Sequence, residues 1–82
     1  MIITIYSTKT CPYCKMEKEY LTKRGIKFIN YFADEDPARA QEMIDKSGQM
    51  GVPVTIIKDD KGKEEIVVGF ERNRLDKIIG IR

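Results

Sequence analysis

The chain has 82 residues, with 15 basic and 13 acidic side chains, a net charge of +2 and no histidine. This balanced charge argues against nucleic acid as the main partner, and the lack of histidine excludes imidazole-based catalysis and histidine metal ligands. No apolar run approaches the roughly 20 residues of a membrane span, and the apolar start over residues 1–6 is too short for a signal peptide. We therefore expect one small cytoplasmic domain, residues 1–82, that acts as a monomer.

The first half of the chain is expected to form a strand, a helix and a second strand. Residues 2–6 are nearly all apolar and rich in β-branched side chains, which favours a central strand. The loop 7–10 offers N-cap side chains, Pro12 suits the first helical position, and Gly25 ends the helix in a left-handed conformation. Residues 26–32 alternate as a second strand should. The predicted buried face of the helix consists of Met16, Tyr20 and Leu21.

A second helix is expected to begin at residues 34–37, where acidic side chains suit the helix dipole and a proline fits the first turn. Ser47 and Gly48 close this helix. Its predicted buried stripe consists of Ala40, Met43 and Ile44.

The last third of the chain predicts a hairpin and a short helix. Residues 54–57 and 66–68 read as strands, and the segment 59–62 between them reads as a turn. Asn73 is the expected cap of the final amphipathic helix. The apolar positions of that helix are Leu75, Ile78 and Ile79.

The order of these elements predicts the fold class. A strand, helix and strand in succession require a parallel pair with a right-handed crossover, and the second half adds a hairpin backed by a helix. We therefore expect an α/β protein with a four-stranded mixed sheet, three helices on both faces of it, and the order βαβαββα. This is a thioredoxin-like layout reduced to its core.

Cys11 and Cys14 are the only cysteines, and they flank Pro12 and Tyr13 where the first strand pattern gives way to a helical one. Thiols at this spacing can close a disulfide across the first turn of a helix. The helix N-terminus stabilises the thiolate of the first one. The motif therefore indicates a dithiol redox catalyst.

Two other interpretations of the cysteines stay open at this point. A structural disulfide would close only a tiny loop, would contribute little entropy, and would be out of place in a reducing cytosol. A zinc site normally requires four nitrogen or sulfur donors, so a metal or iron–sulfur site would need thiolates from two copies of the chain. We expect no bound metal or cofactor.

The chain resembles the glutaredoxins, in particular the small bacterial and archaeal members, over nearly its whole length. The resemblance is carried by Cys-Pro-Tyr-Cys at 11–14, Gly-Val-Pro-Val at 51–54 and Val-Gly-Phe at 68–70. It implies a cis peptide bond between Val52 and Pro53. The backbone of Val52 would then face outward beside the reactive sulfur, where a cysteine-containing peptide can pair with it as an added strand.

The resemblance also implies a role for each residue of the motif. Cys11 would attack a substrate disulfide, and Cys14 would then attack Cys11 and release the reduced substrate. Pro12 would restrict the turn, and Tyr13 would lie beside the substrate groove. Lys9 would add positive potential nearby.

Glutaredoxins recognise glutathione through a lysine before the cysteine motif, the Val-Pro backbone and a Gly-Gly-x-Asp segment after the last strand. Lys9 and Val52–Pro53 match the first two of these features. In the third, Gly69 matches the first glycine, Phe70 replaces the second, and Arg72 stands where the aspartate should be. The third feature is therefore broken.

The resemblance favours a glutathione-linked thiol–disulfide oxidoreductase that reduces protein disulfides or glutathione mixed disulfides, with glutathione as co-substrate. Glu71 or Asn73 would then replace the missing acidic contact. A second hypothesis arises because Gly69-Phe70 also resembles redoxins that thioredoxin reductase recharges and that donate electrons to ribonucleotide reductase. A third hypothesis, from another class, is a carrier of an iron–sulfur cluster or zinc.

Overall fold

The computed structural model describes residues 1–80, so the last two residues of the expected domain, 81–82, lie outside it. The seven elements follow in the predicted order βαβαββα. No helix among the described residues is long and apolar enough to cross a membrane. The elements are β1 (Ile2–Ser7), α1 (Pro12–Lys23), β2 (Ile29–Phe32), α2 (Pro37–Ser47), β3 (Val54–Lys58), β4 (Glu64–Val68) and α3 (Arg72–Ile79).

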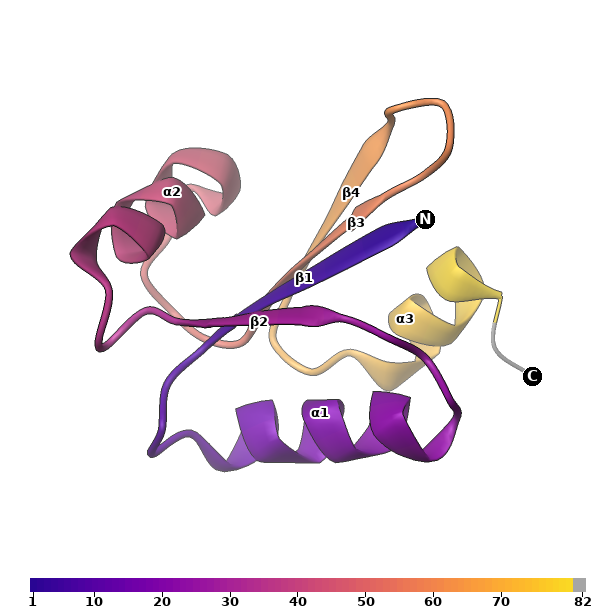
Figure 1. Ribbon diagram of the computed structural model, residues 1–82, viewed down its shortest axis with the longest axis horizontal. Helices are drawn as coiled ribbons and strands as arrows, with labels where there is room; N and C mark the ends of the chain where they lie inside the picture. Colours follow the sequence, from indigo (N-terminus) through magenta and orange to yellow (C-terminus); the bar gives the residue numbers. More distant parts are fainter. Residues whose placement is uncertain (81–82) are drawn as a thin grey trace.

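The four strands form one mixed sheet in the order β2-β1-β3-β4. β1 pairs with β2 in parallel, and β3 pairs antiparallel with both β1 and β4. Helices α1 and α3 lie on one face of this sheet and α2 lies on the other (Figure 1). The expected α/β layout with helices on both faces is therefore confirmed.

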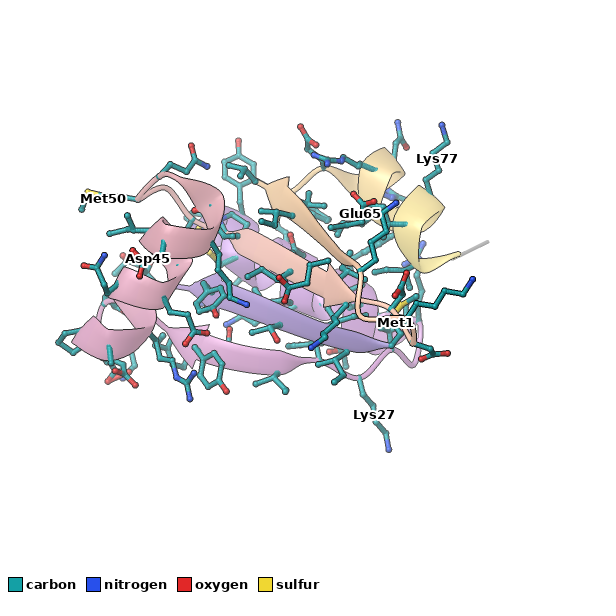
Figure 2. The ribbon with its side chains drawn as sticks, turned by 90° about the horizontal axis from the view of Figure 1, so that it is seen from above. Met1, Lys27, Asp45, Met50, Glu65 and Lys77 are labelled. Carbon is teal, nitrogen blue, oxygen red and sulfur yellow. The ribbon has the colours of Figure 1, made fainter. Side chains whose placement is uncertain are left out.

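The sheet separates two hydrophobic clusters, one under each helical layer. Burial of these apolar side chains is the main favourable contribution to folding. In the view from the α2 side, the helix lies over the sheet and Met50, in the loop that follows it, points into solvent (Figure 2). The cluster under α1 and α3 consists of Ile3, Ile5, Tyr20, Leu21, Ile57, Val67 and Leu75. The cluster under α2 consists of Tyr6, Met43, Val54 and Ile56.

The ends of α1 follow the expected pattern only in part. Pro12 occupies the first helical position and Gly25 has a φ of +71°, as predicted. The N-cap is Cys11 rather than a side chain of the loop 7–10. The second strand begins at Ile29 instead of residue 26. The Ile26 N–H bonds back to the Leu21 carbonyl, so residue 26 still belongs to the end of the helix.

The prediction that Asn73 caps the last helix is wrong. Helix α3 already begins at Arg72, and Glu71 occupies the N-cap position without a capping hydrogen bond from its side chain. The Glu71 carboxylate instead lies 3.7 Å from the guanidinium of Arg74. The first-turn N–H groups of α3 therefore receive no hydrogen bond from the Glu71 side chain.

The predicted buried face of α1 is also partly wrong. Met16 is 50% exposed, whereas Tyr20 and Leu21 are buried as expected. Cys14 and Glu17 complete the buried face. Residues 14, 17 and 21, spaced three and four apart, form one line that faces the sheet. Met16 and Tyr20 lie beside that line, where Tyr20 packs against Phe70 and Met16 is left at the rim of the groove.

Glu17 is a fully buried carboxylate that ties α1 to the sheet. The Thr55 hydroxyl of β3 donates a hydrogen bond to its Oε2 atom. Burial raises the pKa of Glu17 from 4.5 to about 7, although the bond from Thr55 acts in the opposite direction. The side chain is therefore protonated in the folded protein below about pH 7.

Glu17→Gln should make the protein more stable relative to the wild type as the pH rises. The unfolded chain releases the Glu17 proton near its ordinary pKa of 4.5 and the folded chain only near 7, so wild-type stability falls between these values. The variant lacks this loss, so its free energy of unfolding should gain up to about 3 kcal/mol over the wild type across that range. Urea unfolding at both ends of the range measures this difference. An equal effect of the substitution at both pH values would contradict a raised pKa of Glu17 in the folded protein.

Candidate dithiol active site

Cys11 stands at the point where β1 has ended and α1 begins. It has extended backbone angles, φ −86° and ψ 112°, and its Sγ atom accepts a hydrogen bond from the Cys14 N–H at 3.2 Å. The side chain is half-buried and carries a free thiol. A sulfur in this position meets the unpaired N–H groups and the positive end of the helix dipole, which stabilise a thiolate.

Cys14 lies one helical turn further along and is fully buried. Burial, together with the hydrogen bond to Cys11, raises the pKa of the Cys14 thiol to about 12. The two thiols are therefore unequal. Cys11 is the accessible sulfur at the helix start, and Cys14 is a protonated sulfur held behind it.

The loop before β3 faces the first cysteine. The Val52–Pro53 peptide bond is cis, as the family resemblance implies, and the Cys11 thiol donates to the Val52 carbonyl oxygen at an S···O distance of 3.9 Å. The Gly69 N–H donates to the Pro53 carbonyl at 2.8 Å. This bond joins the segment after β4 to the same site, and Gly69 adopts a φ of +81° there, a conformation that glycine tolerates best.

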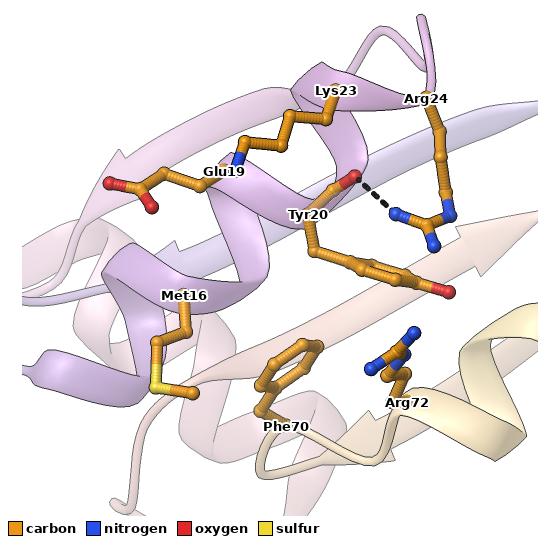
Figure 3. A pocket seen from close by; sticks show the side chains of 7 residues that line it. All are labelled: Met16, Glu19, Tyr20, Lys23, Arg24, Phe70 and Arg72. Atoms are coloured by element: carbon orange, nitrogen blue, oxygen red, sulfur yellow. Dashed lines mark hydrogen bonds between the residues drawn. The ribbon is translucent and has the colours of Figure 1, made fainter.

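Phe70 and Arg72 form a rim with α1 rather than with the cysteines. Phe70 is half-buried, and its ring centroid lies 5.7 Å from that of Tyr20. The guanidinium of Arg72 lies 5.0 Å from the Tyr20 ring centroid, and that of Arg24 lies 3.8 Å from it. These side chains line a groove of about 330 Å³. Figure 3 shows them, with the exposed Met16 at one end.

The other predicted substrate-binding residues lie at the surface near the motif. Tyr13 is 62% exposed, and Pro12 beside it is also exposed. The Lys9 ammonium lies 3.1 Å from the Glu35 carboxylate, so it already has an acidic neighbour. Glu71 is half exposed and pairs with an arginine of its own helix turn.

Glu17 is the residue near the dithiol that sequence reasoning missed. The signal was present, because a residue three positions after Cys14 shares its helix face. A charged residue at such a position is normally assumed to face solvent. Among residues 1–80, no three histidine, cysteine, aspartate or glutamate side chains gather closely enough to hold a metal ion.

Several known proteins are similar to this chain in sequence. The glutaredoxin family model matches residues 3–61. The glutaredoxin-like 8.6 kDa protein in the rubredoxin operon of Clostridium pasteurianum is 42% identical over 78 residues, which cover 95% of this chain and 97% of that protein. Glutaredoxin 3 of Escherichia coli (strain K12) is 38% identical over 55 residues, covering 67% of this chain and 66% of that protein.

The fold also matches solved structures. The NrdH-redoxin of Escherichia coli, a glutaredoxin-like protein with a thioredoxin-like activity profile, superimposes with a TM-score of 0.77 at 27% identity, covering 95% of each chain. The fold is therefore thioredoxin-like. Because the region matched by the family model carries both cysteines and the cis proline, this chain belongs to the glutaredoxin family.

Proposed function

We propose that this protein is a thiol–disulfide oxidoreductase that reduces protein disulfides or glutathione mixed disulfides, with glutathione as its co-substrate. The observation that carries the proposal is the pairing of unequal thiols. Cys11 Sγ sits half-exposed between the Cys14 N–H and the Val52 carbonyl, and the Cys14 thiol is buried behind it. Such a reduced dithiol suits a cytoplasmic protein, where thiols stay reduced.

The exchange proceeds in two steps. The Cys11 thiolate attacks one sulfur of the substrate disulfide, forming a mixed disulfide and releasing the other sulfur as a thiolate. Cys14 then attacks Cys11 Sγ, closing the internal disulfide and releasing the second substrate sulfur. The exposed backbone beside Val52 is where an extended substrate segment would bind, because its carbonyl already lies next to the reactive sulfur.

We favour glutathione as the reductant because it is a small anionic peptide and basic side chains lie around the start of α1. Lys9 and Lys15 are both exposed near the helix start, although Lys9 pairs with Glu35. The positive potential of Lys15, and of Lys9 when it leaves Glu35, attracts an anionic ligand, and salt weakens this effect. Glu71 is the carboxylate adjacent in sequence to position 72, where the aspartate is missing, and it would have to leave Arg74 to meet the ligand amino group.

A second candidate is a redoxin that thioredoxin reductase recharges and that passes electrons to ribonucleotide reductase or a similar acceptor. The rim favours it, since Arg72 supplies a positive charge where glutathione recognition needs a negative one. The fold similarity to NrdH-redoxin points in the same direction. A folded partner would meet a surface formed by Phe70 and the exposed side of α1 (Figure 3).

Substituting the cysteines separately should separate the two steps. Cys11→Ser should abolish all exchange, because no other thiol is accessible. Cys14→Ser should abolish reduction of protein disulfides but retain removal of glutathione from mixed disulfides, since free glutathione can resolve the Cys11 intermediate. Assays with a disulfide protein and with a glutathionylated peptide measure the two activities. Full activity of the Cys11→Ser variant would overturn the proposed function.

Arg72→Asp should shift the choice of reductant toward glutathione. The substitution restores a carboxylate for the ligand amino group and suits the start of α3, where negative charge is favourable. A partly exposed ion pair of this kind should raise kcat/KM for a glutathionylated peptide about two- to fivefold.

The measurement is NADPH consumption with glutathione and glutathione reductase beside a second series with thioredoxin reductase. Lys77→Asp, at the other end of the same helix, is the matched control for a change of charge. Wild-type turnover with thioredoxin reductase alone, unaltered by Arg72→Asp, would favour the redoxin and reject glutathione as the co-substrate.

A further inference from the structure

Glu17 has an unsatisfied oxygen beneath the dithiol. Among the described residues it is the only carboxylate that is fully buried. Its Oε2 atom accepts the hydrogen bond from Thr55, while its Oε1 atom has no hydrogen-bond partner within residues 1–80. A buried polar atom without a partner costs stability, so a purely structural role would be served better by an apolar side chain.

The position of Glu17 relates it to the cysteines. Cys14 and Glu17 are both fully buried and lie three residues apart on α1, so they occupy the same face one turn apart. On the facing strand segment, Pro53 and Thr55 are two residues apart, so their side chains point to the same face of the sheet. Cys11 faces Val52 and Glu17 faces Thr55. The carboxylate therefore lies between α1 and β3, one helical turn beyond Cys14.

The groups around this carboxylate are almost all apolar. Ile5 of β1 and Val67 of β4 flank Thr55 in the sheet register, and α3 contributes Leu75 to the same cluster. The other ionisable side chains on the buried face of α1 are Cys14 and Tyr20.

Two charged side chains, Asp76 near Tyr20 and Lys18 near Cys14, have partners of their own. The Tyr20 hydroxyl bonds to Asp76 of α3, and the Lys18 ammonium lies over the Phe32 ring at 4.8 Å. Within residues 1–80, no basic group forms an ion pair with Glu17. Cys14 is thus the one neighbour on this face that must release a proton in the proposed reaction.

We propose that Glu17 is the internal proton acceptor for Cys14 in the second step of the exchange. This inference rests on the proposed dithiol function and adds a residue to it. In the structure, where both thiols are free, no hydrogen bond joins the carboxylate to Cys14. The transfer therefore requires rotation of the Glu17 side chain or one bridging water.

The step balances as follows. The Cys14 thiol gives its proton to the Glu17 carboxylate, and its sulfur forms a bond to Cys11 Sγ. The bond between Cys11 Sγ and the substrate sulfur breaks, and the electron pair leaves with the substrate as a thiolate. Cys14 and Cys11 are thereby oxidised to the internal disulfide, and the protonated Glu17 later releases its proton to solvent. The raised pKa of Glu17, about 7, places this exchange of protons close to neutral pH.

A stopped-flow reaction with an aromatic disulfide reagent tests the role of Glu17. One equivalent of 5,5′-dithiobis(2-nitrobenzoic acid) releases one coloured thiolate when Cys11 attacks and a second when Cys14 closes the internal disulfide. In the wild type, the rate of the second release should rise with pH through about 7, as Glu17 ionises. Glu17→Gln should slow the second release about 10- to 100-fold above that pH and remove the rise, while the first release is unchanged. Asp45→Asn, which removes an exposed carboxylate from α2, should alter neither phase.

The outcomes separate this inference from the proposed function. A second phase in Glu17→Gln with the wild-type rate and pH profile would overturn the proton-acceptor role and leave the dithiol function intact. A wild-type protein without a first phase would reject the dithiol function itself. If Glu17→Gln does not fold, carbon-13 NMR of the wild-type Glu17 carboxyl decides. Its pKa should differ between the reduced and oxidised protein, and an identical pKa in both would reject the coupling.

Discussion

The antiparallel pairing of β1 with β3 is the constraint on which the site depends. Tyr6 near the end of β1 lies opposite Val54 at the start of β3, so the segment leaving β1 meets the segment entering β3 at one edge of the sheet. β4 runs antiparallel to β3, and its last residue, Val68, is also opposite Val54. Three segments distant in sequence, 7–14, 51–53 and 69–72, therefore converge at this edge. Strand register therefore brings the reactive sulfur to the cis proline, and Gly69 joins the segment after β4 to Pro53.

The two thiols of the site differ in how deeply they are buried. Cys11 lies at the helix start, where backbone N–H groups and a half-open surface suit a nucleophile. Cys14 and Glu17 lie on the buried face of the same helix, where burial favours the protonated form of both. A helix that begins at the sheet edge thus holds one reactive group at the surface and two proton-carrying groups behind it. This division arises because Cys11 is the N-cap residue that precedes α1, whereas residues 14 and 17 lie on the face of the helix that packs against the sheet.

The fold was predictable wherever local signals and burial agree. The element order, Pro12 at the helix start and Gly25 at its end all follow from backbone requirements that few residues satisfy. The cis bond at Pro53 was expected only from the family resemblance, because local sequence does little to select the cis form.

Other features depended on tertiary packing. Met16 is apolar but turns outward, and Glu17 is charged but buried, because the angle at which α1 meets the sheet decides which side is covered. Phe70 replaces a glycine of the glutathione-recognition pattern, and its ring packs against Tyr20, a residue 50 positions earlier in the chain. Such a contact leaves no periodic signal in the sequence.

The central claim is that Cys11 acts first and Cys14 resolves the intermediate within the same chain. A rapid acid quench of the wild-type protein with a glutathionylated peptide, followed by peptide mapping by mass spectrometry, tests this order most directly. The account predicts that a mixed disulfide on Cys11 forms first and gives way to a disulfide between Cys11 and Cys14. Modification of Cys14 before Cys11, or disulfides only between separate chains, would contradict it.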